Sequence, residues 1–267
     1  MFIFQNERFD NMLELNNVSA GYDGFDVINN ISLNIKYGEN LCILGPNGCG
    51  KSTLIKAIAG LIPSTGQILM DNENVGKMNR HEIARKIAVM NQISSVYFSY
   101  SIYETVLLGR YVHMKGPFKQ PTEYDEDCVD RCLKAVELYD IKDKQISTLS
   151  GGQLQRVFLA RTLAQEPNII LLDEPTNHLD LRYQTELIDY LNEWSKDGKH
   201  SVVGVLHDIN LALTLGDKFV LLEEGSIASY GNAETAVTVE KLDKVFNMDV
   251  VSYMLNSLGK WKTIATQ

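Results

Sequence analysis

The sequence predicts an α/β fold with a substantially parallel core sheet and an inserted helical segment. Short apolar runs bounded by turn residues alternate with stretches of helical spacing over most of the chain. A glycine-rich loop joins one such run to a helix, which is typical of α/β architecture. From about residue 93 to 150 the strand-like runs disappear and helical spacing takes over. We therefore expect this stretch to be a helical insertion in the α/β core.

The elements follow in order along the chain. Residues 40–45 form an apolar run that ends in glycine, and residues 51–59 then carry helical spacing at Leu54, Ile55 and Ile58. Three further apolar runs predict buried strands over residues 169–172, 202–206 and 219–222. An amphipathic stretch between the first two of these runs predicts a helix over residues 181–196.

The insertion and the C-terminal segment have their own patterns. Residues 101–113 and 123–139 predict two helices, separated by a patch rich in turn residues. The last 35 residues predict a short helix over 240–247 and an extended tail. We expect one domain, comprising a core subdomain (1–92 and 151–231), a helical subdomain (93–150) and a C-terminal helix and tail (232–267).

Composition excludes several classes of protein. An apolar fraction of 45% with 22% charged residues is ordinary for a globular chain and excludes disorder. The 25 basic and 34 acidic side chains give a net charge of −9, which argues against nucleic-acid binding. No run of 18 apolar residues predicts a membrane span, and residues 1–8 lack a secretory signal pattern. We therefore expect the protein to stay in the cytosol.

Four cysteines in 267 residues do not make a disulfide scaffold. Cys128 and Cys132 are four residues apart and should share one helix face. A metal site would need two more ligands nearby, and none has suitable spacing. Buried or idle thiols are the better interpretation of this pair.

The strongest motif is Gly45-Pro46-Asn47-Gly48-Cys49-Gly50-Lys51-Ser52-Thr53, which matches the phosphate-binding loop pattern. Its glycines let backbone N–H groups converge on an anion, and the helix that follows adds the positive end of its dipole. Lys51 is expected to reach the β- and γ-phosphates, and Ser52 to ligate magnesium. A mere tight turn would leave this spacing unexplained.

Two acids follow the apolar run at 169–172. Asp173 and Glu174 end a predicted central strand, beside the loop that binds phosphate in open α/β sheets. Asp173 would hold magnesium through its water shell, and Glu174 is a candidate general base for the attacking water. Apolar strands often end in acids, so this motif gains its weight from the upstream loop.

Other polar positions are ambiguous on physical grounds alone. Ser150 and Gln153 have the spacing of a capping box, yet Gly151 and Gly152 leave the helix N–H groups bare for a second phosphate. For three further residues a structural role is the more common one, although each is also placed to contact nucleotide: His207 after one strand, Gln92 after another, and the aromatic Tyr22 in a turn.

These motifs, in this order, resemble the nucleotide-binding subunit of ABC transporters over nearly the whole chain. The resemblance implies a P-loop NTPase (RecA-like) core with an antiparallel β region and an inserted α-helical subdomain. It implies that Tyr22 stacks on adenine, that Gln92 senses the γ-phosphate and the metal, and that His207 is the switch histidine. Residues 45–53 correspond to the Walker A loop, Asp173 and Glu174 to Walker B, Leu149 to Gln153 to the signature sequence, and Asp180 to the D-loop.

The resemblance also implies partners. Two copies would face head to tail, so that Ser150, Gly151 and Gly152 of one cap the ATP held by the other. The closing pair would drive a membrane permease through the surface near Gln92 to His113, on the cytoplasmic face of the membrane. An extracytoplasmic binding protein would act through the permease, with ATP and magnesium as cofactors.

Segments such as 104–113, 206–212 and 245–250 are similar to ATPases of importers for iron–siderophore complexes, haem and cobalamin. Importers of zinc, manganese or molybdate have related segments, so these metals remain a second possible class of cargo. The sequence also has to be weighed against a repair, chromosome or translation ATPase, a small-molecule kinase, and a scaffold that binds ATP only for assembly. A repair, chromosome or translation ATPase would carry coiled-coil arms or a second cassette, which this sequence does not show. A small-molecule kinase would have no need of the segment from Leu149 to Gln153. A turnover assay distinguishes the scaffold, which would release no phosphate.

Two residues depart from the family pattern. Asn91 stands where proline commonly precedes the glutamine, which puts the stiffness of that hinge in question. Cys49 stands where a small residue is usual within the phosphate loop. This suggests that thiol reagents inhibit the protein and that bound ATP protects it.

Overall fold

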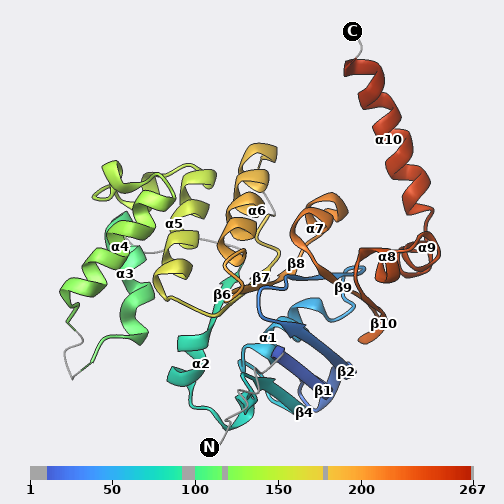
Figure 1. The fold of residues 1–267 in the computed structure, drawn as a ribbon, viewed down its shortest axis with the longest axis horizontal. Coiled ribbons are helices and arrows are strands. Elements are labelled where there is room, and N and C mark those ends of the chain that lie inside the picture. Colours follow the sequence, from blue (N-terminus) through green and yellow to red (C-terminus); the bar gives the residue numbers. More distant parts are fainter. Residues whose placement is uncertain (1–10, 92–99, 116–119, 177–179, 266–267) are drawn as a thin grey trace, which may run out of the picture.

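The computed structural model describes residues 11–91, 100–115, 120–176 and 180–265 of the 267-residue chain. Over these ranges the central sheet has the strand order β10-β9-β3-β8-β7-β6 (Figure 1). Its strands pair in parallel except for the β9–β10 hairpin. They are β3 (Leu41–Leu44), β6 (Ile87–Asn91), β7 (Ile169–Asp173), β8 (Ser201–Val205), β9 (Lys218–Glu223) and β10 (Ser226–Gly231).

A second, antiparallel sheet lies below the central sheet in Figure 1. Its order is β2-β1-β4-β5, and its strands are β1 (Asn11–Tyr22), β2 (Phe25–Lys36), β4 (Ser64–Met70) and β5 (Glu73–Asn74). The expected antiparallel β region is therefore confirmed.

Burial on both faces explains the all-apolar sequence of the central strands. Along β7, Ile169 and Leu171 join the core shared with the antiparallel sheet and α1 (Lys51–Ile58). Ile170 and Leu172 point into the opposite core. That core is covered by α5 (Gly151–Ala164), α6 (Leu181–Ser195) and α7 (Ile209–Leu215). A strand buried on both faces needs a continuous apolar run rather than alternation.

The helical insertion is confirmed, with shorter helices than the spacing predicted. The expected helix over 101–113 is α3 (Ile102–Leu107) followed by a 3₁₀ segment, η2 (Leu108–Val112). The expected helix over 123–139 ends earlier, as α4 (Glu123–Ala135), because Glu137 adopts a left-handed backbone with φ 57°. Two 3₁₀ segments follow α4 in the insertion, η3 (Tyr139–Ile141) and η4 (Ile146–Thr148). Two short elements precede β6, η1 (Val75–Lys77) and α2 (Arg80–Lys86).

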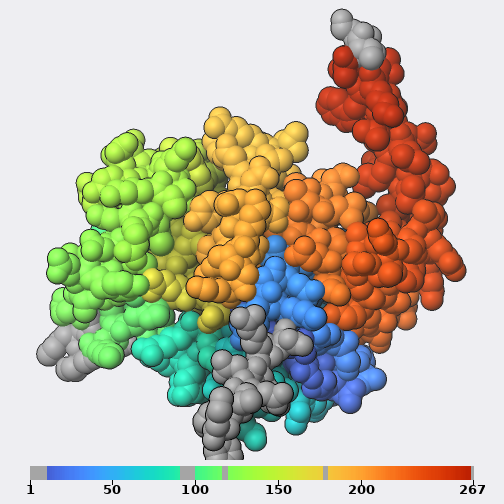
Figure 2. All heavy atoms as spheres, in the orientation of Figure 1, coloured from blue at the N-terminus to red at the C-terminus, as the bar shows by residue number. Residues whose placement is uncertain are grey.

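Helix α5 packs on both α3 and α4 as well as on the central sheet. The helical layer therefore continues to Ala164, beyond the expected boundary at residue 150. It forms one lobe, at the left of Figure 2. This packing positions the start of α5, where the segment from Leu149 to Gln153 lies.

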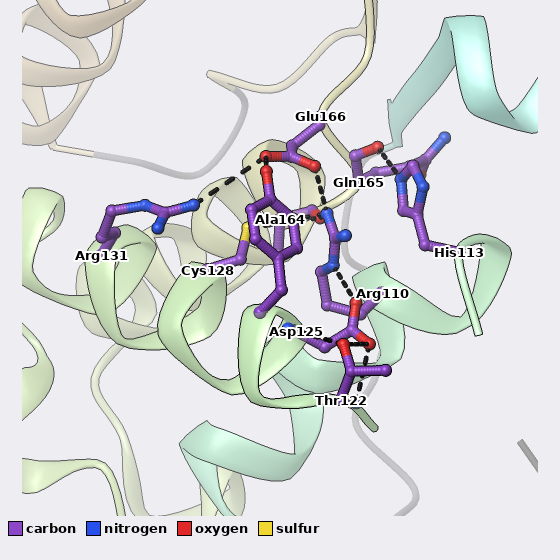
Figure 3. A network of polar contacts seen from close by, with 10 residues as sticks. Arg110, His113, Thr122, Asp125, Cys128, Arg131, Ala164, Gln165 and Glu166 are labelled. Carbon is purple, nitrogen blue, oxygen red and sulfur yellow. Dashed lines mark hydrogen bonds and ion pairs between the residues drawn. The ribbon is translucent and has the colours of Figure 1, made fainter. Parts of the chain in front are cut away.

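A buried ionic cluster fixes the far end of α5 within this layer (Figure 3). Arg110, which is 2% exposed, donates from Nε to Asp125 Oδ1 at 2.9 Å and from Nη1 to Glu166 Oε2 at 2.6 Å. The same Nη1 donates to the carbonyl of Ala164 at 2.8 Å. These contacts join η2, α4 and the C-terminal end of α5.

Replacing Arg110 with alanine is expected to destabilise the protein by about 3 kcal/mol or more, because Asp125 is left buried without its cation. Arg131 serves as a matched control, since its side chain is 58% exposed and lies 4.0 Å from Glu166. Its change to alanine should cost less than about 1 kcal/mol. Urea titration followed by circular dichroism measures both, and equal losses for the two variants would contradict the assignment.

The C-terminal segment differs from its prediction. The short helix is confirmed as α9 (Val239–Phe246), preceded by α8 (Ala233–Ala236). The tail, expected to be extended, is instead α10 (Val250–Ala265), which projects from the body in Figures 1 and 2. Asp249 starts it by accepting a hydrogen bond from the backbone N–H of Ser252 at 2.9 Å, a capping signal that the sequence analysis missed.

Candidate functional site

The glycine-rich loop lies between β3 and α1, and its backbone requires glycine. Gly45 and Gly50 have φ of 153° and 104°, in the region that favours glycine. A Cβ atom on Gly45 would lie 2.3 Å from the carbonyl oxygen of Leu222. Gly50 begins α1 without a side-chain cap, and the first turn has no acid. The N–H groups of this helix start therefore remain available for an anion.

Lys51 lies within this loop and is 5% exposed. Its Nζ donates to the carbonyl oxygens of Gly45 and Pro46, at 2.9 and 2.8 Å. These two hydrogen bonds hold the Lys51 ammonium group against the start of the glycine-rich loop. A phosphate entering the loop would meet this charge at short range in a partly dry site.

Strand register brings the acidic motif to the same edge of the sheet. Val205 of β8 lies opposite Ile43 of β3 on one side and Asp173 of β7 on the other. The Ser52 hydroxyl donates to Asp173 Oδ1 at 2.7 Å, across 121 positions of sequence. Two of the three residues predicted to serve magnesium, Ser52 and Asp173, are therefore in direct contact.

Glu174 and His207 meet beside them. His207 Nε2 lies 2.7 Å from Glu174 Oε1, and the two side chains are 37% and 24% exposed. Glu174 adopts a left-handed backbone with φ 55°, which is unusual for a residue with a side chain and is found often at functional sites. Its backbone N–H donates to the Val205 carbonyl at 3.2 Å, which holds the turn in place.

Several of these residues line one hollow of about 410 Å³. It is lined by Val27, Asn47, Gly48, Gly50, Lys51, Ser52, Thr53, Glu174 and His207. Val27 was not predicted; it comes from β2, and no motif marks it. Tyr22 is 43% exposed at the end of β1, with Lys56 Nζ 5.8 Å from its ring centre, and is not among the lining residues.

The signature sequence opens α5 as a complete capping box. Ser150 Oγ accepts from the Gln153 N–H at 3.3 Å, and Gln153 Oε1 accepts from the Ser150 N–H at 3.1 Å. Ser150 and Gly151 are exposed. Neither they nor Asp180, which caps α6 through the Tyr183 N–H at 3.1 Å, line the hollow at Lys51. The structure thus gathers part of the predicted site and leaves the signature outside it.

Two further positions complete the comparison with the sequence. Gln92 lies outside the described residues. Gln155, which was not predicted, is buried and donates from Nε2 to the Pro175 carbonyl at 3.0 Å. This bond ties the signature helix to the segment just after Glu174. A glutamine on the mostly apolar buried side of α5 was the available signal.

Cys49 does not support the expectation of a reactive thiol. Its side chain is 5% exposed, and burial raises its pKa despite the nearby Lys51. A protonated, buried thiol is a poor nucleophile. We therefore correct this expectation: reagents should reach Cys49 poorly whether or not nucleotide is bound.

Gly151 and Gly152 give a matched pair for a prediction about folding. A Cβ on Gly152 would lie 2.4 Å from the Tyr183 ring, whereas a Cβ on Gly151 meets nothing within 4 Å. Gly152→Ala should therefore destabilise the protein by about 1–3 kcal/mol through overpacking. Gly151→Ala should leave stability unchanged or slightly raised, as measured by chemical denaturation. The reverse order would show that this helix start is packed differently.

Among the described residues no cluster of three His, Cys, Asp or Glu side chains is placed to hold a metal. Ser52 and Asp173 nevertheless fit magnesium, because it prefers oxygen ligands and takes one or two carboxylates together with substrate phosphates. Within the described ranges, no helix has both the length and the apolar character needed to cross a membrane.

Comparison with known proteins supplies the family. A family model described as ABC transporter matches residues 28–177. The petrobactin import ATP-binding protein FpuD of Bacillus anthracis is 37% identical, over 89% of this chain and 87% of that protein. The ferric enterobactin transport ATP-binding protein FepC of Escherichia coli K12 is 34% identical, over 86% and 85%. The ATP-binding cassette MJ0796, solved as a post-hydrolysis dimer bound to ADP and Pi, is 32% identical with a TM-score of 0.72, over 83% and 98%.

Proposed function

Because the chain belongs to the ABC transporter family and is an ATPase of that family, we propose that it powers the import of an iron–siderophore complex or a related metal chelate. The observation that carries the ATPase part is the contact of Asp173 with Ser52, which lines one hollow together with Lys51, Glu174 and His207. The cargo part is supported by the two relatives, which are named for petrobactin import and for ferric enterobactin transport.

Binding of ATP relies on charge and on backbone donors. The triphosphate would lie in the loop from Gly45 to Thr53, with Lys51 at the β- and γ-phosphates. Tyr22 would stack on adenine, since its ring is exposed beside Lys56. Magnesium would be held by Ser52 and, through water, by Asp173 and Gln92. When bound, the ion neutralises charge that develops on the phosphate oxygens.

Hydrolysis needs a positioned water molecule. Glu174 would orient this water and accept its proton as the oxygen attacks the γ-phosphorus. His207, 2.7 Å from the carboxylate, would hold Glu174 in this orientation and brace the γ-phosphate. The strained backbone at Glu174 fixes its side chain before substrate arrives, so little reorganisation remains for the reaction.

The rest of the site would come from a second copy of the chain. Within one chain Ser150, Gly151, Gly152 and Gln153 do not line the hollow, and Ser150 and Gly151 are exposed. In a head-to-tail pair they would cap the γ-phosphate bound by the other copy, with Asp180 near the joint. ATP then favours the closed pair because it binds the closed state more tightly than the open one.

We infer that the closed pair acts on a separate membrane permease. The ATPase would be peripheral, on the cytoplasmic face, and would contact the permease through Gln92 and α3. An extracytoplasmic binding protein would deliver the chelate to the permease. The Gln155–Pro175 bond offers a route by which motion of α5 reaches Glu174.

Cells that carry the tagged chain test this proposal directly. Membranes should yield the chain together with a permease, and uptake of radiolabelled ferric siderophore should fall to background when the chain carries Lys51→Ala. The control is Lys199→Ala, which removes an exposed lysine outside the hollow. Loss of zinc, manganese or molybdate uptake, with chelate uptake unchanged, would overturn the cargo assignment and leave the ATPase assignment intact.

A further inference from the structure

The hairpin that joins β1 to β2 carries an aromatic side chain that the fold leaves in solvent. Phe25 is 79% exposed, and no other large apolar side chain among the residues that the structure describes is as exposed. It lies directly opposite Tyr22 in the antiparallel pairing of the two strands, and Tyr22 is 43% exposed. Two exposed aromatic rings therefore stand side by side at this end of the lower sheet in Figure 1.

The turn holds these two rings in a fixed arrangement. Its two residues are Asp23 and Gly24, with φ of 53° and 83°, and a type I′ hairpin turn requires positive φ at both positions. A Cβ atom on Gly21 would collide with the carbonyl oxygen of Phe25, so the strands approach closely here. Side chains directly opposite each other share one face of a sheet, with Cβ atoms about 4.5–5.5 Å apart. The rings of Tyr22 and Phe25 therefore form one apolar platform.

The platform lies on the face of the sheet that is turned toward α1. Residues two apart on a strand share a face, and Ala20 is buried in the core that includes α1. Tyr22 therefore lies on this face, and Lys56 Nζ of α1 is 5.8 Å from the centre of its ring. Phe25 shares the face with Tyr22 because the two are opposite each other. Val27, further along β2, lines the hollow at the phosphate loop.

Adenine stacked on Tyr22 would lie beside Phe25 as well. A purine has two fused rings, whereas a pyrimidine has one. Because the two side chains are offset by about 5 Å, the second ring of a purine would meet Phe25, and a pyrimidine would be covered by Tyr22 alone. The apolar surface that Phe25 adds to the contact is therefore larger for a purine.

We propose that Phe25 is a base-selecting residue, which makes the site prefer purine over pyrimidine nucleoside triphosphates. This inference rests on the proposed function, because it needs the base to stack on Tyr22. Stacking on one aromatic ring tolerates every base, since every base has a π-face, so Tyr22 alone gives little selectivity. Phe25 has no hydrogen-bonding group in its side chain, and so it does not distinguish adenine from guanine.

Competition binding to the full chain tests the proposal, with labelled ATP displaced by ATP, GTP, CTP or UTP. Wild type should bind the two purine nucleotides about tenfold more tightly than the two pyrimidine nucleotides. The Phe25→Ala variant should bind the purine nucleotides about five- to tenfold more weakly and the pyrimidine nucleotides within about twofold of wild type. Inorganic tripolyphosphate, which has no base, should bind equally to both proteins.

Two further variants serve as controls. Phe25→Tyr restores an aromatic ring and should restore the purine preference. Tyr253→Ala removes an exposed aromatic side chain from α10 and should change none of the dissociation constants. Circular dichroism establishes that each variant is folded.

Two results would overturn the proposal and leave the proposed function intact. One is that wild type and Phe25→Ala bind the purine nucleotides equally. The other is that tripolyphosphate binding weakens as much as ATP binding, which would show that the hairpin acts through the phosphate loop. A wild type that binds ATP no more tightly than tripolyphosphate would give the base no site, and would contradict both the proposed stacking on Tyr22 and this inference.

Discussion

The Glu174→Gln variant is expected to bind ATP as wild type does and to hydrolyse it more slowly, on the order of a hundred-fold or more. Glutamine keeps the shape of the side chain and can still contact His207, which lies 2.7 Å from the carboxylate in wild type. It cannot accept the proton of the attacking water. Phosphate release at saturating ATP measures the rate, and equilibrium dialysis with labelled ATP measures binding.

A matched control for this change is Glu234→Gln, which alters the same chemical group at an exposed position in the first turn of α8. Its turnover should equal that of wild type. Near-normal turnover in Glu174→Gln would remove Glu174 from the role of base. Loss of ATP binding in that variant would instead place the carboxylate among the binding groups.

The Ser150→Asp variant is expected to bind ATP as a single chain and to lose ATP-dependent pairing and turnover. Aspartate caps helices as well as serine does, so α5 should start normally. The new carboxylate would, however, stand where the account places the partner's γ-phosphate. Two like charges in a partly dry interface repel strongly. Light scattering with and without ATP measures the pairing.

Asn232→Asp is the control, because Asn232 caps α8 from an exposed position and the change keeps the shape of the side chain. It makes the same charge change at a helix start that is outside the hollow lined by Lys51. Pairing should persist in this variant. Equal loss of pairing in both variants would show that net charge, rather than the signature sequence, governs the association.

Elements with strong local signals were predictable from the sequence. The strands that end at Leu44, Asp173 and Val205 are apolar because both faces are buried, and such runs stand out in the sequence. The phosphate loop was predictable for a related reason. Glycine is required there on steric grounds, because a Cβ atom added at position 45 would lie 2.3 Å from the carbonyl oxygen of Leu222.

Features that depend on long-range contacts were not predictable. The Ser52–Asp173 contact is a partial exception, because parallel strands end at one edge of a sheet and bring their following residues together. Val27 could not be predicted to line the hollow, because it comes from the other sheet. The buried Arg110 cluster joins positions from 110 to 166, and an arginine in an amphipathic stretch gives no sign of it. Helix α10 was not predicted, and its apolar side chains are mostly exposed in the structure. A helix that does not pack against a core shows only weak apolar periodicity in its sequence.

The central claim is that ATP lies between the glycine-rich loop of one copy and the signature sequence of another. Cross-linking tests it most directly, with Asn47→Cys in one tagged copy and Ser150→Cys in a second, both in a chain whose four native cysteines are serine and which retains turnover. The account predicts that a short bis-maleimide links the two different copies with ATP and not without it. No link between copies that pair with ATP, or a link that forms equally without ATP, would contradict it.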